Sequence, residues 1–473
     1  MGRFPMISRR RFAQGALASL AAGLSPIAFR AAKANDGFLE ITAGPSAHKL
    51  YRDEAAASNL WTYNGSLPGP AIRARRGERI KVRLINKLEE ATSIHWHGIR
   101  IENAMDGVSG LTQMAVPPGE SFEYDFASPD AGTFWYHAHN KSWNQVGRGL
   151  YGPLIIEGDD EAFDVEHDLT LMLDDWRLDE SGKLHEASFG SLMDWSHAGR
   201  LGNWLTVNGM SLPSFDLVAG ASYRVRLINA SNARILELDL AGLGAKLLAL
   251  DGQSVGEPAP IAEAGFLLGP AQRADIMITP ETGSDWALKE VSSGDPFDIA
   301  TFRIVPGGSG APMSAKYALQ PNDVPEPDLA SARVLKLDMT GGAMGMMGDM
   351  VYKGQPLTRE LMRETGQLWA FNGTANLADE PFFQAGRGET IILDVVNNTA
   401  FAHAMHSHGH HFKILEQSRA LVEDTGFFRD TVLVDAGERV RIAFVADNPG
   451  KWLFHCHMLE HAAAGMNTWF EVA

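Results

Sequence analysis

The sequence Phe454-His455-Cys456-His457-Met458, close to the C-terminus, decides how the rest of the chain is interpreted. Cys456 is the only cysteine among 473 residues, so it has no partner for a disulfide within the chain. In an extended strand successive side chains point to opposite faces, which puts Cys456 on one face and the two flanking histidines on the other. The pattern therefore predicts two metal centres joined by one strand.

The cysteine face offers a thiolate together with His461 and Met466, which follow Cys456 by five and ten positions. Two imidazoles, a thiolate and a weakly bound thioether form the ligand set of blue-copper electron-transfer sites. The second imidazole has to come from elsewhere in the chain. The opposite face offers His455 and His457, about 6.6 Å apart at about 3.3 Å per residue, a separation that suits neighbouring metal ions.

Further histidines occur in pairs that share one face of a strand, because residues two apart point the same way. These pairs are His95 and His97, His137 and His139, and His406 and His408, with His403 three positions before the last pair. Zinc is the alternative metal, but ten histidines, one cysteine and one methionine exceed any single zinc shell. The methionine also favours copper.

One sequence phrase recurs three times: a tryptophan-containing segment ends in Asn-Gly, and a later segment of alternating polarity ends in a second Asn. The paired asparagines are Asn64 and Asn86, Asn208 and Asn229, and Asn372 and Asn397, separated by 22, 21 and 25 positions. Alternating segments between Gly and Pro turns are typical of antiparallel sandwiches. We therefore predict an all-β fold of three tandem β-sandwich domains.

The predicted domain boundaries follow an acidic junction near Gly158 to Glu161 and a Pro/Gly-rich run from Pro306 to Pro327. A chain of this length, 45% hydrophobic, is ample for several cores. The domains predicted are residues 35–160, residues 161–306 and residues 307–473, the last opening with a linker over residues 307–330.

The N-terminus has the order of an export signal. Ser8-Arg9-Arg10-Arg11-Phe12 precedes an apolar run and then the small-residue pattern Ala32-Lys33-Ala34. This order is typical of twin-arginine signal peptides, with a buried first helix as the alternative. We predict that residues 1–34 are removed and that the mature protein is periplasmic.

Charge and hydropathy exclude other classes of partner. The formal net charge of -17 argues against nucleic-acid binding, which requires clustered Lys and Arg, and suits cationic or small neutral substrates. No apolar run after the N-terminal one is long enough to span a bilayer. We expect a monomer without a membrane span.

The histidine motifs together resemble those of three-domain multicopper oxidases of the bacterial laccase and periplasmic cuprous-oxidase type, over essentially the whole chain after residue 34. The resemblance implies cupredoxin-like Greek-key sandwiches and four copper ions. A type 1 copper lies in the third domain, the first and third domains share a trinuclear cluster, and the second domain is a spacer without copper. By motif position, the type 1 copper takes His403, Cys456, His461 and Met466, the type 2 copper takes His95 and His406, and the type 3 pair takes His97, His137, His139, His408, His455 and His457.

The resemblance also implies an activity: one-electron oxidation of a reductant, coupled to four-electron reduction of O2 to water. The expected reductant is Cu(I) or a phenolic or aromatic small molecule, with a role in copper tolerance. One alternative is a general laccase acting on phenols or diamines without such a role. An alternative from another class is a non-catalytic periplasmic copper-sequestering protein.

Asp106 is the candidate catalytic residue outside the ligand set. It lies nine positions after His97, where related enzymes keep a carboxylate near the type 2 copper, and would act as a proton relay. The alternative is a turn aspartate before Gly107. Related enzymes often place another acid directly after the last type 1 histidine, but this chain has Ala462 there, and Glu460 need not replace it.

Five methionines cluster within twelve positions of the third domain: Met339, Met344, Met346, Met347 and Met350. Thioethers suit Cu(I), so the segment resembles the methionine-rich insert of cuprous oxidases, although it is shorter. The alternative is a linker or an adaptable hydrophobic cover. Thr399 and Phe401 argue against the cuprous interpretation, since copper-efflux oxidases have Asp and Met at these positions.

Overall fold

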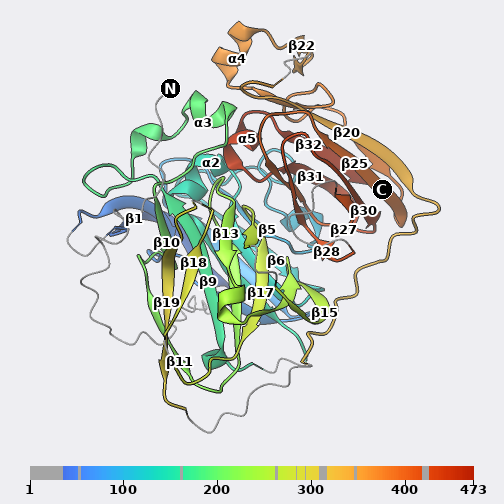
Figure 1. The fold of residues 1–473 in the computed structure, drawn as a ribbon. Helices are drawn as coiled ribbons and strands as arrows, with labels where there is room; N and C mark the ends of the chain where they lie inside the picture. The colour runs from blue at the N-terminus through green and yellow to red at the C-terminus, as the bar shows by residue number, and fades with distance from the viewer. Residues whose placement is uncertain are drawn as a thin grey trace.

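The computed structural model describes residues 36–51, 55–159, 163–261, 265–283, 285–292, 294–307, 317–345, 349–417 and 426–473. The predicted signal peptide, Met346, Met347 and residues 308–316 of the predicted linker lie outside the described residues. Strands make up most of the regular structure in these ranges, and they form pairs of packed sheets (Figure 1). The all-β prediction is confirmed.

The first sandwich consists of two packed sheets, and the consecutive strands of this part of the chain are divided between them. One sheet has the order β2-β1-β4-β6 and the other the order β3-β8-β7-β5. The strands are β1 (Leu39–His48), β2 (Ser58–Tyr63), β3 (Ile72–Arg75), β4 (Arg79–Asn86), β5 (Ile94–His97), β6 (Ser121–Ala127), β7 (Gly132–Ala138) and β8 (Tyr151–Glu157). In β4 the apolar Ile80, Val82 and Leu84 are buried while the intervening basic residues face outward, as the alternating sequence predicts.

The second sandwich has sheets of order β10-β9-β12-β17-β14-β15 and β11-β19-β18-β13-β16. Its strands are β9 (Asp168–Trp176), β10 (Trp204–Val207), β11 (Ser214–Val218), β12 (Tyr223–Asn229), β13 (Leu236–Asp239), β14 (Lys246–Leu250), β15 (Gln253–Pro260), β16 (Phe266–Leu268), β17 (Arg273–Ile278), β18 (Trp286–Glu290) and β19 (Phe297–Val305). Its leucine-rich core forms a hydrophobic cluster of its own. Every residue of β12 and β17 is buried, because these strands also face the other sandwiches.

The third sandwich has sheets of order β23-β20-β25-β30-β27-β28 and β24-β32-β31-β26-β29. Its strands are β20 (Arg333–Gly341), β23 (Trp369–Phe371), β24 (Phe383–Ala385), β25 (Glu389–Asn397), β26 (His403–Ser407), β27 (Phe412–Gln417), β28 (Phe428–Arg429), β29 (Thr431–Val434), β30 (Arg439–Ala446), β31 (Gly450–Cys456) and β32 (Asn467–Val472). Strand β31, which carries the Cys456 motif, lies between β32 and β26 inside its sheet.

Helices are short and lie at the ends of the sandwiches. They are α2 (Ser142–Gln145), α3 (Leu192–Ser196), α4 (Arg359–Thr365) and α5 (Leu459–Ala463), with one-turn 3-10 helices η1 (Asn103–Met105), η2 (Val146–Arg148), η3 (Val165–His167), η4 (Glu186–Ser188) and η5 (Ala241–Leu243), and a small hairpin of β21 (Val351–Tyr352) and β22 (Gln355–Pro356). Figure 1 shows α3 of the second sandwich beside α5 of the third. Among the described residues, none of these helices is both long and apolar enough to cross a membrane.

The repeated Asn-Gly phrase is a repeated turn. The first asparagine of each copy has a positive φ of 54°, 52° or 46° and is followed by a glycine that also has positive φ, so the pair makes the tight turn that Asn-Gly favours. Each asparagine side chain then bonds both an N–H and a C=O of its own sandwich's first strand: Asn64 bonds Thr42 and Glu40, Asn208 bonds Met172 and Thr170, and Asn372 bonds Asp338 and Lys336.

The second asparagine of each copy also has one role in all three sandwiches. Asn86, Asn229 and Asn397 are fully buried, each donates to carbonyls of two separate segments, and each accepts from the N–H two residues further on. These buried amides hold the loops at one end of each sandwich. In the third sandwich, that loop leads directly into the metal-ligating strand β26.

The first and third sandwiches share one hydrophobic core, which includes Trp96 and Phe134 from the first and Cys456, Met466 and Phe454 from the third. This contact brings the histidine pairs of the first sandwich close to those of the third. Buried ion pairs join the second sandwich to its neighbours. Asp168 of the second sandwich pairs with Arg73 of the first and also with Arg226 of its own sandwich. Arg273 of the second sandwich pairs with Asp430 of the third.

Replacing Asn229 with alanine tests the role of the buried amides. The change leaves the carbonyls of Arg234 and Leu268 without a donor and the Ser231 N–H without an acceptor. We expect a loss of about 3 kcal/mol in unfolding free energy, seen as a lower thermal midpoint at a fixed scan rate. Asn59→Ala, at an exposed position of β2, should change stability by no more than about 0.5 kcal/mol. Equal midpoints for the two variants would contradict this role.

Candidate metal centres

The first centre lies on the cysteine face of β31. Strand β31 pairs with β26, and Met405 lies opposite Cys456. His403 is two residues before Met405, so it faces the same side of the sheet, and α5 provides His461. The Cys456 sulfur lies 3.6 Å from His403 Nδ1 and 3.8 Å from His461 Nδ1. The two nitrogens are 3.0 Å apart, and all three side chains are buried. The structure thus brings together the thiolate and both imidazoles predicted for the type 1 site.

The outer nitrogens of these imidazoles fix their tautomers. His403 Nε2 lies 2.8 Å from Thr399 Oγ1, whose own proton is donated to Asn397 Oδ1, so the histidine is the donor. His461 Nε2 donates to the carbonyl of His197 at 2.5 Å. Both Nδ1 atoms therefore present lone pairs toward each other and toward the sulfur. Two facing lone pairs at 3.0 Å in a buried site fit a shared cation.

Burial sets the protonation states of this centre. It lowers the pKa of His461 to about 4 and that of His403 well below its ordinary value, so both rings are neutral. Burial also raises the pKa of Cys456 to about 12, so the metal-free site holds a thiol. Copper binding would displace that proton, as metals do when they bind thiolates.

Met466, the predicted axial ligand, is fully buried beside the cysteine. Its carbonyl accepts from the Cys456 N–H at 3.1 Å, and its side chain belongs to the same hydrophobic cluster as Cys456 and Trp369. The Trp369 ring packs against both type 1 imidazoles, with centroid distances of 5.1 Å to His403 and 4.5 Å to His461. The centre therefore lies in an apolar shell.

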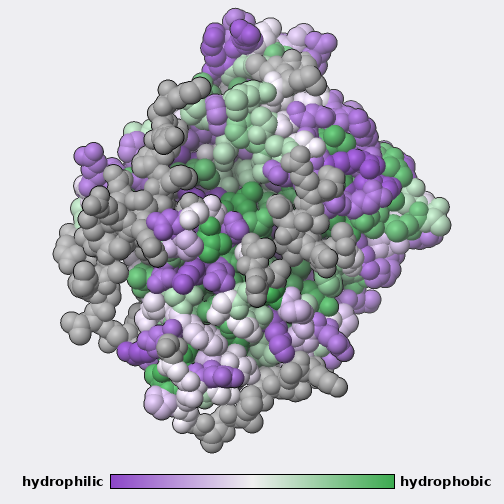
Figure 2. Space-filling view, in the orientation of Figure 1, coloured by the Kyte–Doolittle hydropathy of each residue, from purple (hydrophilic) through white to green (hydrophobic). Residues whose placement is uncertain are grey.

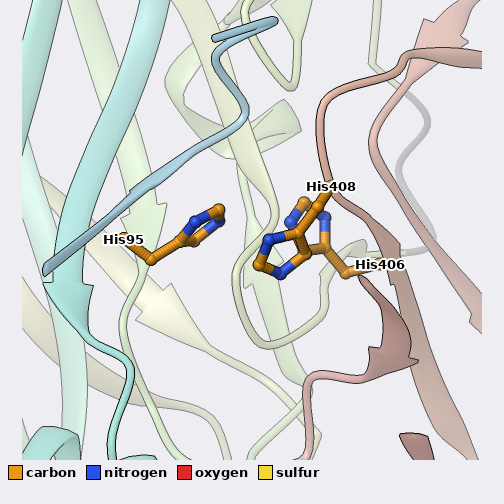
Figure 3. A group of neighbouring side chains, drawn as sticks. All are labelled: His95, His406 and His408. Atoms are coloured by element: carbon orange, nitrogen blue, oxygen red, sulfur yellow. The ribbon is translucent and has the colours of Figure 1, made fainter. Parts of the chain in front are cut away.

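The second centre lies between the first and third sandwiches and contains all eight remaining predicted histidines. Within it, ligand nitrogens come within 4.8 Å of one another in three overlapping groups: His95 with His406 and His408, His95 with His97 and His137, and His139 with His408 and His455. Figure 3 shows His95 reaching from β5 toward His406 and His408, which come from the other sandwich. His457 joins the cluster 3.4 Å from His137, measured between Nε2 atoms.

The atoms of this cluster fit metal ions. Within the part of the chain that the structure describes, several buried nitrogens have no hydrogen-bond partner: His95 Nε2, His97 Nδ1, His406 Nε2 and His457 Nδ1. His408 and His455 meet Nε2 to Nε2 at 3.2 Å. Buried polar atoms are costly to leave unpaired, so converging nitrogens of this kind indicate ligand positions.

Burial keeps seven imidazoles of the cluster neutral. Desolvation, with repulsion between neighbouring rings, holds the pKa of His97, His137, His139, His408, His455 and His457 well below the ordinary histidine value. Desolvation also lowers the pKa of His406, although Asp430 opposes the shift. Neutral imidazoles are the form in which histidine binds metals.

Asp106 lies at the cluster, as the sequence predicts, and it also directly precedes the turn glycine Gly107. Its carboxylate accepts from His408 Nδ1 at 3.0 Å, and its backbone carbonyl accepts from His95 Nδ1 at 2.8 Å. Gly107 follows with φ +82°, and a Cβ there would lie 1.8 Å from the Ile94 carbonyl oxygen. The turn therefore requires glycine and presses Asp106 against both ligands.

Asp430 is the cluster residue that sequence reasoning missed. Its carboxylate lies 3.3 Å from His97 Nε2, and its backbone carbonyl accepts from His406 Nδ1 at 2.9 Å. Arg273 of the second sandwich clamps the same carboxylate at 2.8 and 2.6 Å. Although burial opposes ionisation, Arg273 and the hydrogen bonds from neighbouring histidines hold the Asp430 pKa well below its usual value.

Other residues noted in the sequence lie outside the clusters. Glu460 turns toward the second sandwich, where its Oε1 accepts from Asn232 Nδ2 at 2.8 Å, so it does not take the place of an acid at Ala462. His410 and His411 are not ligands of either group. Each makes a hydrogen bond to a backbone carbonyl, that of His408 and that of Gly98 respectively, as expected for structural histidines.

The methionine-rich segment does not act as one unit. Met339 lies in β20 and is fully buried, and Met350 is 3% exposed, so both belong to the core. Met344 is 82% exposed. The surface interpretation therefore applies to Met344 among the three described methionines, and the core explains Met339 and Met350.

These two centres, joined by a His-Cys-His strand across paired sandwiches, define a copper protein that combines a blue-copper site with a multi-histidine cluster. Three family models, each described as multicopper oxidase, match residues 46–161, 167–301 and 352–473. The chain belongs to the multicopper oxidase family. Members of this family characteristically bind four copper ions of types 1, 2 and 3 and couple oxidation of a reductant to reduction of O2.

Individual relatives agree with this family. The chain is 30% identical over 441 residues to the multicopper oxidase MmcO of Mycobacterium tuberculosis, covering 86% of this chain and 82% of that one. A multi-copper oxidase structure from Pseudomonas thermotolerans has TM-score 0.80 and 34% identity, covering 92% and 98% of the two chains. A multicopper oxidase structure from Campylobacter jejuni, described as a metallo-oxidase, has TM-score 0.75 and 26% identity, covering 94% of each chain.

Replacing Asp106 with asparagine tests its predicted proton relay. The backbone bond to His95 remains, but the carboxylate that accepts from His408 is lost. We expect oxygen consumption by copper-loaded protein to fall about 10²-fold. The intense thiolate-to-copper absorption of the type 1 site should persist. Turnover equal to wild type across the pH range would remove Asp106 from the catalytic machinery.

Replacing Arg273 with glutamine tests whether the second sandwich supports the cluster. The change leaves a buried carboxylate unpaired, which costs about 3–5 kcal/mol, and frees Asp430 to rotate away from His97. We expect copper content to drop at the cluster while the type 1 absorption is retained. Arg303→Gln, which breaks an exposed Arg303–Asp216 pair, is the matched control. Full copper content in both variants would refute the effect.

Proposed function

We propose that this multicopper oxidase uses Cu(I) as its reductant and acts in copper tolerance. The observation that carries the proposal is two exposed methionines on segments that adjoin the type 1 site: Met193 is 52% exposed and Met344 is 82% exposed. Their segments are joined by the hydrogen bond from Ala343 N–H to the Ser196 carbonyl. Thioethers are soft ligands that suit Cu(I), and a net charge of -17 attracts cations.

Copper ions bound at the two centres would supply the one-electron changes, and the overall reaction is O2 with four electrons and four protons giving two waters. The chain supplies the route and the geometry. Cys456 is flanked by His455 and His457, so one residue's backbone separates the thiolate from the cluster. Asp106 holds the His408 ring through its Nδ1–H, and its carboxylate also lies 3.2 Å from His95 Nδ1.

Some relatives have descriptions that name metal oxidation or transport, while others are called laccases. The Campylobacter jejuni protein is described as a metallo-oxidase, and one curated relative from Epichloe festucae is called an iron transport multicopper oxidase. These descriptions apply to those proteins. For this chain they favour a reductant that is itself a metal ion.

A laccase acting on phenols or diamines is the second candidate. Thr399 and Phe401 occupy the positions where copper-efflux oxidases have Asp and Met, and the Phe401 ring lies 5.6 Å from that of His197 at the type 1 edge. The third candidate is copper sequestration without turnover. Oxygen uptake on addition of any reductant to copper-loaded protein eliminates sequestration.

We also propose that the mature protein is periplasmic and reaches that compartment by twin-arginine export. The proposal depends on the Arg9-Arg10-Arg11 motif before the apolar run and the Ala32-Lys33-Ala34 cleavage pattern. Cell fractionation of the full chain tests it, and retention of unprocessed protein in the cytoplasm would refute it.

Removing both exposed thioethers tests the cuprous proposal. We expect wild type to consume one O2 for every four Cu(I) ions, and Met193→Ser combined with Met344→Ser to lower kcat/KM for Cu(I) about tenfold, because soft ligands near the entry point are lost. The rate with a methoxyphenol should not change. Met114→Ser, at another 82% exposed methionine, is the control. An unchanged cuprous rate in the double variant would favour the laccase candidate.

A further inference from the structure

A segment of the second sandwich lies directly against the type 1 site. This cover segment, residues 192–202, consists of α3 and the turn that follows it, and it packs against α5, which holds His461. In Figure 1, α3 lies next to α5, although Leu459 at the start of α5 follows Ser196 at the end of α3 by 263 positions. A copper-free sandwich therefore forms one wall of the copper site.

Backbone hydrogen bonds attach the cover segment to the third sandwich. Three consecutive carbonyls are the acceptors: Trp195 O accepts from Trp369 Nε1 at 2.6 Å, Ser196 O accepts from Ala343 N–H at 2.7 Å, and His197 O accepts from His461 Nε2 at 2.5 Å. Two of the three donors, Trp369 and His461, belong to the type 1 centre itself. The cover segment is therefore held by the site that it covers.

The second sandwich holds the cover segment from the other side. Arg177 clamps the buried carboxylate of Asp194 at 2.7 and 3.0 Å and also donates to the Leu201 carbonyl. Gly199 has φ +78°, and a Cβ there would lie 2.4 Å from Ala233 Cβ and 3.3 Å from Glu460 Oε2. The segment fits against its neighbours without room for one additional carbon atom at this position.

The fit leaves no free edge on the type 1 imidazoles. His461 is fully buried and its Nε2–H is donated to His197 O, while His403 is fully buried and donates to Thr399. A reductant meets the outer face of the cover segment instead, where Leu192, Met193 and Leu201 are 37–52% exposed. Figure 2 shows hydrophobic residues gathered on this face below α4, in the region of α3 and α5.

Reductants differ in what they must release. A metal ion such as Cu(I), or hexacyanoferrate(II), loses one electron and nothing else. A phenol loses one electron and its hydroxyl proton together to give a neutral phenoxyl radical, so it benefits from a hydrogen bond to a group at the point of electron transfer. The outward-facing nitrogen of His461, Nε2, already donates its hydrogen bond to the His197 carbonyl, so it is not available to a phenol.

We infer that the cover segment selects the reductant: electrons enter through the His197 peptide and its hydrogen bond to His461, so donors that release only an electron are accepted, and phenols and aromatic diamines are disfavoured. In either case the electron would pass to copper held by His403, Cys456 and His461, and a phenol's proton would pass to water. The inference rests on the proposed oxidase function and names the part of the chain that sets its substrate class.

Displacing the cover segment without touching a copper ligand tests the inference. Gly199→Ala places a methyl group against Ala233 and pushes the segment outward, whereas Gly220→Ala imposes the same strained φ, +81°, in the second sandwich with no atom within 4 Å of the new carbon. Copper-loaded wild type and both variants are assayed by oxygen uptake with hexacyanoferrate(II) and with a dimethoxyphenol. The type 1 absorption and the copper content are measured alongside.

We expect Gly199→Ala to raise kcat/KM for the phenol about tenfold or more relative to Gly220→Ala. The hexacyanoferrate(II) value should stay within about twofold. Equal changes for both donors, or no change for the phenol while the type 1 spectrum shows an altered site, would overturn the inference. Absence of oxygen uptake with either donor in wild type would instead refute the oxidase function, so the two failures are distinguishable.

Asp194→Asn provides a second route if Gly199→Ala gives too little folded protein. It weakens the clamp from Arg177 and loosens the cover segment without adding volume. The same selective rise in phenol oxidation is expected. A phenol rate equal to wild type in a folded, copper-loaded Asp194→Asn protein whose segment has become accessible to limited proteolysis would contradict the inference.

Discussion

A buried imidazole can present a lone pair to a metal ion only if its other nitrogen has somewhere to donate its proton, and this requirement organises the interior of the protein. Both type 1 histidines and six of the eight cluster histidines have their outer nitrogen within hydrogen-bond reach of a protein oxygen. Those oxygens belong to Thr399, His197, Asp106, Asp430, Ala138 and Cys456. Most of them are backbone carbonyls, so the ring orientations depend on the path of the main chain and on few exchangeable side chains.

This dependence explains why the second sandwich is more than a spacer. It provides none of the histidines in the metal groups of the described residues, yet it contacts both centres. Arg273 holds the carboxylate that orients His97, and the carbonyl of His197 accepts from His461. Both contacts act on the outer side of a ligand, where they affect orientation and access without replacing copper.

Much of this architecture could be predicted from the sequence, because it is encoded by local spacing. The alternation around Cys456, the paired histidines and the repeated asparagines each follow from one strand or one turn, and the structure contains all of them. Asp430 and Arg273 could not be found this way, since their importance arises from contacts between residues 157 positions apart. A backbone carbonyl such as that of His197 leaves no signal in the residue type at all. Closeness in sequence also did not decide the surroundings of the clustered methionines, since Met339 lies in the core and Met344 on the surface.

The alternation of β31 has a consequence for how such a protein can change over time. Because Cys456 and its flanking histidines face opposite sides of one strand, a slip of a single residue against β26 would exchange the thiol and the imidazoles between the two centres. An insertion or deletion within this strand would therefore disable electron entry and oxygen chemistry in one event. Variation in this part of the chain is confined to substitutions that keep the register, and the two centres are inherited as a single unit.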